Sequence, residues 1–423
     1  MKNILNIEYE KFKLQNNLDV VLYQDKSLPI VAVNIWYKIG SANEKPGKTG
    51  LAHLFEHMMF QGSEHVPKEM HFRYIQEAGG TLNGSTSIDR TNYYESVPST
   101  NLEMVLWLES DRMGYLLPAL TQEKLDNQIG VVSNERRQNY ENQPYGLAWE
   151  KLFSTLYPKN YPYNWPTIGW MEDIENYNFD DVKNFFNTFY SPQNASLVIG
   201  GNFDFAEAKD LVKSYFGNIT NKTEMPKLNV KPPKLTESKK VILKDDVQLP
   251  RLYLAWISDK AYGKDDAKLD ILADILTGSK NSRLYKELLI DQQIAQDISA
   301  FQYSGNLNGA FIIVATPKPG VKLDVLKKEI FNQINFLLKS GITKAELRRS
   351  LNSYKSSFIY SLQNLDNLAN QINNYNCFLN EPNSFIYDIG RYEKVTGKDV
   401  VSVTEKYLNT NFVELNVVPK EKN

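Results

Sequence analysis

Two histidines and a glutamate in one short apolar stretch are the residues best suited to chemistry in this chain. The segment from Gly50 to Gly62 contains His53, Glu56 and His57 in the pattern H-x-x-E-H. Because residues i and i+4 lie on one face of an α-helix, the two imidazoles can bind one metal ion together. Glu56 projects near that face, where a carboxylate can take the proton of a metal-bound water. The order of residues is the inverse of the common H-E-x-x-H zinc motif.

A chance arrangement on an ordinary amphipathic helix is the alternative interpretation of this stretch. The remaining positions do form an apolar side, made of Leu51, Leu54, Phe55, Met58 and Met59, and a single histidine on such a helix is usually structural. Here two of the four histidines in the chain coincide with a glutamate. The combination favours a metal site.

Two histidines leave a catalytic zinc site one protein ligand short, and the third ligand is often a glutamate. Residues 121–142 predict a long helix whose apolar stripe of Leu125, Ile129 and Val132 is continued by Glu135. Glu135 therefore fits best. Other acidic residues remain open as alternatives: Glu95, Glu109, Glu123, Asp126 and Glu141. Such a ligand set suits one Zn²⁺ per chain, with Mn²⁺ or Co²⁺ as substitutes.

Length and composition exclude several classes of protein. A chain of 423 residues exceeds one typical core and predicts at least two domains. The formal charge of −2 gives no basic surface for nucleic acid, and no stretch is long and apolar enough to span a membrane. The N-terminus lacks the apolar region of a signal peptide. We therefore expect a cytoplasmic location, or a periplasmic one if a signal peptide has been removed.

The pattern of elements predicts two similar α+β domains. Val20–Pro29 aligns with Val241–Pro250, and Leu54–Ser63 aligns with Asp270–Ser279, where the metal-binding positions become apolar. A polar segment with three prolines and six lysines, residues 221–240, predicts a linker. The expected domains are residues 1–220 and 241–423, each a mainly antiparallel sheet flanked by helices. Within the first, residues 81–98 predict strands with a bend at Asn83-Gly84.

The chain resembles the pitrilysin/insulysin family of metallopeptidases, in particular its half-length branch with the mitochondrial processing peptidases. The resemblance runs nearly end to end and rests on GLAHLFEHMMFQGS, AGGTLNGSTSIDRTNYYESVP, VVSNERRQNYENQPYG, YSPQNASLVIGGNF and SRLYKELLIDQQIA. The family pattern places V-V-x-x-E about 75 residues after H-x-x-E-H. Here 77 residues separate His57 from Glu135, so the resemblance implies that Glu135 is the third ligand.

The resemblance also implies an activity and a place for the substrate. It implies a zinc-dependent endopeptidase that forms one half of a clamshell and hydrolyses short or unfolded peptides in its chamber, with Glu56 activating the water. A peptide would add as an extra strand to an exposed sheet edge. The corresponding residues here are Leu82, Asn83, Gly84, Ser85 and Thr86.

Two departures from the family pattern concern the completeness of the site. A second acid common in the family is replaced by Gln128, which puts an outer-sphere contribution to the metal in doubt. The Arg and Tyr that hold substrate correspond to Leu289 and Gln296, which cannot do their work. We therefore expect a heterodimer with a related chain that supplies the Arg–Tyr pair. An active homodimer and a non-catalytic structural core subunit of the same fold are the alternatives.

Overall fold

The computed structural model of the chain describes residues 6–226 and 228–420. Runs of strands and runs of helices follow one another along these ranges. In chain order they are β1 (Tyr9–Lys13), β2 (Asp19–Gln24), β3 (Ile30–Tyr37), α1 (Leu51–Met58), α2 (Met70–Glu77), β4 (Thr81–Thr86), β5 (Thr91–Pro98), α3 (Leu102–Ala119), α4 (Gln122–Arg136), α5 (Ala148–Leu156), α6 (Met171–Ile174), α7 (Phe179–Phe189), β6 (Ala195–Gly201), α8 (Phe205–Phe216), β7 (Lys239–Asp245), β8 (Arg251–Ser258), α9 (Asp266–Thr277), α10 (Arg283–Tyr285), β9 (Ala295–Ser304), β10 (Gly309–Pro317), α11 (Leu323–Ser340), α12 (Lys344–Ser361), α13 (Leu365–Leu379), α14 (Phe385–Glu393), α15 (Gly397–Val403) and β11 (Val413–Pro419).

Contacts between residues divide the chain into two compact units that are not continuous in sequence. The first unit contains residues 1–136, 165–228 and 359–386, and the second contains residues 137–164, 229–358 and 387–423. The expected domains, with boundaries at residues 220 and 241, are each continuous in sequence. The observed units are each built from three separate segments of the chain. The chain passes from one unit to the other five times.

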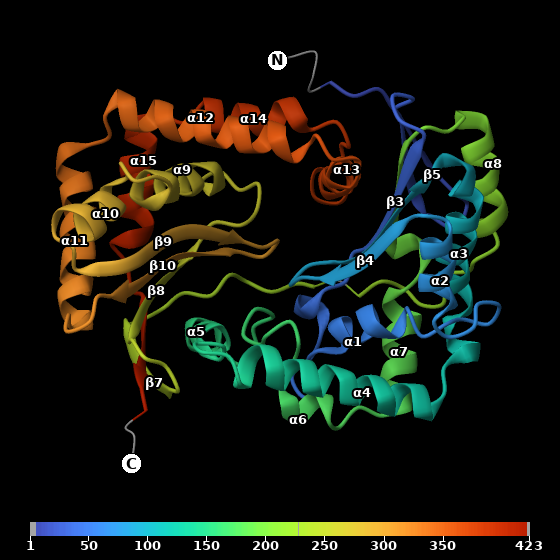
Figure 1. The fold of residues 1–423 in the computed structure, drawn as a ribbon, viewed down its shortest axis with the longest axis horizontal. Helices are drawn as coiled ribbons and strands as arrows, with labels where there is room; N and C mark the ends of the chain where they lie inside the picture. Colours follow the sequence, from blue (N-terminus) through green and yellow to red (C-terminus); the bar gives the residue numbers. More distant parts are fainter. Residues whose placement is uncertain (1–5, 227, 421–423) are drawn as a thin grey trace. The chain divides into compact units, whose positions relative to one another are not determined.

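The sheet of the first unit has six strands in the order β1-β2-β6-β3-β5-β4. Strands β2 and β6 are parallel, and the other neighbours are antiparallel. Helix α3 lies on one side of β3, and α13 lies on the other side (Figure 1). Strand β4 is at the edge of the sheet.

The sheet of the second unit repeats this arrangement with five strands in the order β7-β11-β8-β10-β9. Here β7 and β11 form the parallel pair, and β9 is the edge strand that corresponds to β4. Its core gathers buried side chains from the sheet and from α9, α11 and α15. The predicted α+β class with two similar domains is confirmed, with one parallel pair in each mainly antiparallel sheet.

Each sheet is covered in part by a helix from the other half of the sequence. On the first sheet, α13 donates from Asn373 to the carbonyl of Asn34 at 2.8 Å, and the Trp36 indole donates to Asn370 at 3.0 Å. On the second sheet, α5 places the Trp149 ring 5.5 Å from that of Tyr253. These contacts explain why the compact units are discontinuous.

The predicted bend at Asn83-Gly84 is wrong, because both residues lie within β4. The turn comes later, at residues 87–90, where the Ser87 N–H donates to the Arg90 carbonyl at 2.8 Å. The Ser87 hydroxyl also accepts from the Asp89 and Arg90 N–H groups. A serine therefore supplies the turn that glycine was expected to supply.

In the part of the chain that the structure describes, none of the helices could cross a bilayer.

Candidate metal centre

Helix α1 carries the H-x-x-E-H motif and is fixed at both its start and its apolar side. Gly50 precedes the helix with φ of +92°, a conformation that favours glycine. The Glu44 carboxylate accepts from the N–H groups of Gly50 and Ala52, both at 2.8 Å, and so satisfies donors that a helix start leaves unpaired. Phe55 is buried and stacks on Phe185 with ring centres 5.5 Å apart. The opposite side of the helix is left to the two histidines and Glu56.

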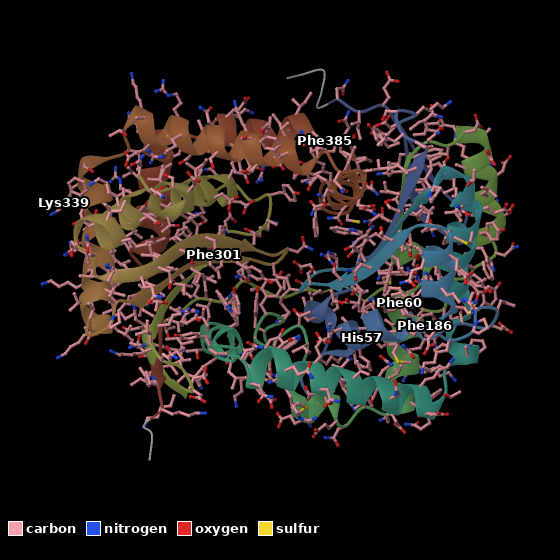
Figure 2. All side chains as sticks on the ribbon, in the orientation of Figure 1. His57, Phe60, Phe186, Phe301, Lys339 and Phe385 are labelled. Carbon is pink, nitrogen blue, oxygen red and sulfur yellow. The ribbon has the colours of Figure 1, made fainter. Side chains whose placement is uncertain are left out.

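The two histidines of α1 meet Glu135 of α4. His57 Nε2 lies 3.2 Å from one Glu135 carboxylate oxygen, and His53 Nε2 lies 3.7 Å from the other. One donor atom from each residue lies within 4.8 Å of the other two. All three side chains are partly accessible, with exposed fractions of 13%, 25% and 32% for His53, His57 and Glu135. Figure 2 labels His57 on α1.

The donor set fits a zinc ion. Ligand atoms about 2.0–2.2 Å from a tetrahedral ion lie roughly 3.3–3.6 Å from one another, close to the separations of 3.2 and 3.7 Å seen here. Burial, followed by the neighbouring His57, lowers the pKa of His53, which favours the neutral imidazole that binds metals. Among the described residues, Glu135 is also the acid that joins both histidines of α1.

Glu56 lies beside the edge strand β4. A Cβ atom on Gly84 would come within 3.1 Å of Glu56 Cγ and 3.2 Å of Tyr93, so a larger residue at this position would press on both side chains. No hydrogen bond or ion pair to the Glu56 carboxylate occurs within residues 6–226 and 228–420, and the side chain is partly exposed. The carboxylate is therefore available to a water or a substrate.

The outer edge of β4 presents backbone groups that do not pair with β5, and it lies next to Glu56. Since Ser87 pairs with Arg90 through a hydrogen bond, the antiparallel alternation directs the N–H and C=O of Leu82, Gly84 and Thr86 away from β5. Asn83 and Ser85 alternate with them and pair with Tyr94 and Asn92. The Gly84 N–H also donates to the Asn83 side chain at 2.8 Å.

Three other residues were singled out from the sequence: Gln128, Leu289 and Gln296. Gln128 is buried on α4 and donates to its neighbour Asn127 at 2.9 Å. Leu289 packs against the core of the second unit, and Gln296 is exposed on the edge strand β9. Neither Leu289 nor Gln296 offers the charge or phenol of the family's Arg–Tyr pair.

A second histidine–carboxylate cluster is fully buried. His71 Nε2 lies 3.5 Å from Glu95, and these two residues together with Glu109 bring their donor atoms within 4.8 Å of one another. Arg112 occupies the centre of this cluster: its guanidinium donates to Glu95 at 3.1 Å and to Glu109 at 3.0 Å. His71 and Arg112 were not predicted from the sequence, and Glu95 and Glu109 were considered only as possible ligands of the other site.

Electrostatics distinguish this cluster from the first. Burial, reinforced by Glu109, raises the pKa of Glu95 well above its ordinary range, and burial lowers the pKa of His71 well below its own. Arg112 therefore supplies the positive charge that balances the acids. It also lies over the Tyr93 ring at 4.2 Å, and Tyr93 donates to the Phe55 carbonyl on α1 at 3.1 Å.

Two family models match the chain in succession. "Insulinase (Peptidase family M16)" matches residues 19–167, and "Peptidase M16 inactive domain" matches residues 176–354. Among the described residues, the donor cluster of His53, His57 and Glu135 lies within the range that the first model matches.

Individual relatives share both sequence and fold. "Zinc protease PqqE" of Helicobacter pylori is 31% identical over 87% of this chain and 83% of its own. "Probable mitochondrial-processing peptidase subunit beta" of Arabidopsis thaliana is 24% identical over 85% of this chain and 68% of its own. The crystal structure of a protease from Helicobacter pylori superposes with a TM-score of 0.92 at 28% identity, covering 98% of this chain and all of that one.

Proposed function

We propose that this chain, which belongs to the M16 (insulinase) family of peptidases, is a zinc-dependent endopeptidase of short or unfolded peptides. The observation that carries the proposal is the convergence of His53, His57 and Glu135 beside Glu56. When bound there, zinc supplies Lewis-acid activation of water and of the scissile carbonyl. Mn²⁺ and Co²⁺ are suitable substitutes for the same ligands.

The edge of β4 binds the substrate in this proposal. A peptide in an extended conformation pairs with the outward backbone groups of Leu82, Gly84 and Thr86 as an added strand. Adjacent strands are about 4.8 Å apart, so the peptide backbone runs close to Glu56, which Gly84 already approaches. In pairing, a substrate carbonyl replaces the Asn83 side chain as acceptor of the Gly84 N–H.

Glu56 acts as the general base and then as the general acid. Its carboxylate takes a proton from the attacking water and passes a proton to the nitrogen of the departing amine. The absence of a hydrogen-bond or ion-pair partner among the described residues leaves both oxygens available for this transfer. The histidines and Glu135 hold the metal and do not exchange protons in this scheme.

A partner chain completes the site in this proposal. Leu289 and Gln296 stand where the family pattern has the substrate-holding Arg and Tyr, so a related chain with that pair would form a heterodimer around an enclosed chamber. The similarity to a protein named as one subunit of a processing peptidase supports a two-chain assembly. A homodimer and a non-catalytic subunit of the same fold are the competing outcomes.

The test replaces Glu56 by Gln and measures both metal and hydrolysis. We expect Glu56→Gln to keep one zinc per chain and to lose hydrolysis of a quenched mixed-sequence peptide. Glu123→Gln, on the exposed side of α4, is the control that keeps both. Near-normal turnover by Glu56→Gln contradicts the role of Glu56.

The assembly is tested by assaying the zinc-loaded chain alone and mixed with a related chain that carries the Arg–Tyr pair. Activity in the mixture alone supports the heterodimer. Full activity of the chain alone identifies a homodimer or a self-sufficient chain. Bound zinc without activity in either sample favours the non-catalytic alternative.

A further inference from the structure

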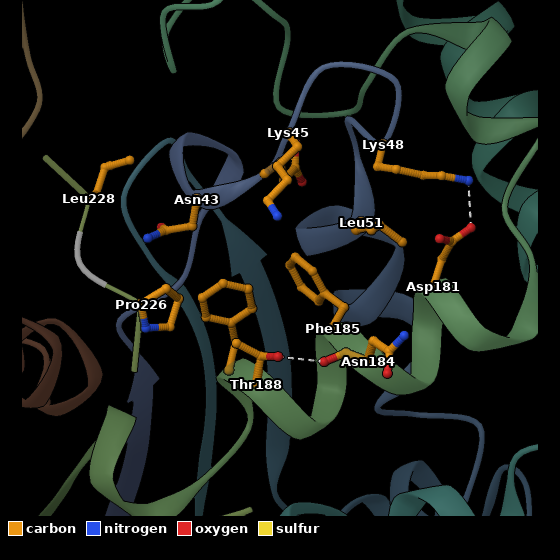
Figure 3. A pocket seen from close by; sticks show the side chains of 12 residues that line it. Asn43, Lys45, Lys48, Leu51, Asp181, Asn184, Phe185, Thr188, Pro226 and Leu228 are labelled. Atoms are coloured by element: carbon orange, nitrogen blue, oxygen red, sulfur yellow. Dashed lines mark hydrogen bonds and ion pairs between the residues drawn. The ribbon is translucent and has the colours of Figure 1, made fainter. Parts of the chain in front are cut away.

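A cavity of about 480 Å³ lies in the first unit beside the start of helix α1. Its floor is apolar and includes Leu51, Phe185 and Phe189, each less than a tenth exposed. Pro226 and Leu228 line one side. A volume of this size is typical of sites for small organic molecules. Figure 3 shows the side chains around it.

The polar groups of the cavity offer donors in excess of acceptors. Lys45 extends its amine into the opening above Phe185 (Figure 3), and no described residue pairs with that amine. The Asn184 amide also lines the cavity without a side-chain partner among the described residues. Asn43 uses its side-chain oxygen to accept from the Gly40 N–H at 3.1 Å, which leaves its amide N–H groups.

The acidic groups of the cavity are already committed. Asp181 pairs with Lys48 at 2.5 Å and accepts from the Asn178 N–H at 3.1 Å. Both oxygens of Glu44 accept backbone N–H groups of α1. Burial raises the pKa of Glu44 to about 8, so this carboxyl repels an incoming anion less than an exposed one would. Among the described residues that line the cavity, Lys45 carries the charge that has no ion-pair partner.

We propose that this cavity binds a small monocarboxylate with an apolar ring or branched chain. The ring packs on Phe185 and Phe189 while the carboxylate meets the ammonium of Lys45 and the amide of Asn184. The site is separate from the edge of β4, and it shares Glu44 and Leu51 with the start of the metal-binding helix. Its occupant therefore contacts the residues that fix α1 without contacting the metal ligands.

Binding of 3-phenylpropionate tests the proposal. The zinc-loaded Glu56→Gln protein is titrated by calorimetry, so that the outcome does not depend on peptidase activity. We expect saturable binding in the submillimolar to millimolar range, as is usual for so small a ligand. The neutral 3-phenylpropionamide should bind at least tenfold more weakly, because it lacks the charge that pairs with Lys45.

Variants locate the ligand. Lys45→Gln should weaken binding of 3-phenylpropionate about tenfold and leave the amide unaffected, whereas Lys26→Gln, at an exposed turn, should change neither. Thr188→Trp fills the cavity from α7 and should abolish binding at an unchanged melting temperature. Absence of saturation at 10 mM, equal affinity for acid and amide, or full affinity in Lys45→Gln each overturns the proposal.

Discussion

The first unit contains two clusters of histidine and glutamate that differ in burial and in charge, although they consist of the same residue types. His53, His57 and Glu135 are partly exposed, whereas His71, Glu95 and Glu109 are buried around Arg112. An ion can reach the first cluster, and the second is already neutralised by a guanidinium. Ligand type and spacing alone therefore do not define a metal site. The local balance of charge, and whether an ion can reach the ligands from solvent, determine whether a metal binds.

The largest expected effect follows from removing Arg112. Arg112→Met leaves Glu95 and Glu109 buried without their cation, and we expect the free energy of unfolding to fall by about 3–5 kcal/mol. Urea denaturation of the zinc-loaded protein measures it. Arg348→Met, at an exposed position of α12, is the matched control and should change stability by less than about 0.5 kcal/mol. A similarly small loss in Arg112→Met would mean that the buried acids are held neutral without it.

Metal content tests the other half of the comparison. We expect one zinc per chain, and Glu135→Gln should weaken its binding by more than the roughly 10–100-fold that loss of an outer-sphere contact costs. Glu123→Gln on the same helix should bind zinc normally. Competition with a chromophoric chelator gives the affinity, and elemental analysis gives the stoichiometry. If the protein bound two zinc ions and Glu135→Gln kept one of them tightly, that ion would lie in the buried cluster. The two clusters would then not differ in metal binding.

The pH dependence of stability reports on His71. Its pKa is lowered in the folded state, so below about pH 6.5 the unfolded chain binds a proton that the folded chain does not. This group therefore makes stability fall with decreasing pH, by at most about 1.4 kcal/mol per pH unit. His71→Gln should flatten the slope between pH 6.5 and 5 in chelated protein. An unchanged slope means that His71, which faces Glu95 and Arg112, is protonated in the fold.

The smallest effect is expected where the two clusters meet. Tyr93 lies against Arg112 and donates to the Phe55 carbonyl of α1, which also accepts the helical N–H of Met59 at 3.0 Å. Because that carbonyl keeps one donor, Tyr93→Phe should cost only about 1 kcal/mol of stability and change zinc affinity less than tenfold. A larger loss of zinc affinity would show that the buried cluster positions the metal-binding helix.

Local pattern was enough to predict the elements that carry the candidate metal site. The apolar positions of α1, such as Leu54 and Phe55, are buried as expected. Periodicity on the helix before Arg136 favoured Glu135, and the structure brings that residue to the histidines. Such predictions succeed because helical spacing alone fixes which side chains share a face.

Non-local packing accounts for what the sequence did not predict. Gly84 suggested a bend, but its lack of a Cβ serves the approach of Glu56 from another element. Arg112 of α3 has its partners at positions 95 and 109, and charged residues are ordinarily placed at the surface. Likewise, the amphipathic pattern of α13 predicts that one face of the helix is buried. It does not predict which of the two sheets the helix covers.

The exchange of helices has a consequence for synthesis on the ribosome. The last strand of the first sheet, β6, ends at Gly201, and α13, which covers one face of that sheet, begins at Leu365, 164 residues later. At about 5–20 residues per second, the gap lasts roughly 10–30 s. During that time the face with Trp36 and Asn34 has no cover from its own chain. A translation product that stops before residue 365 therefore has an incomplete first unit, however complete its metal ligands are.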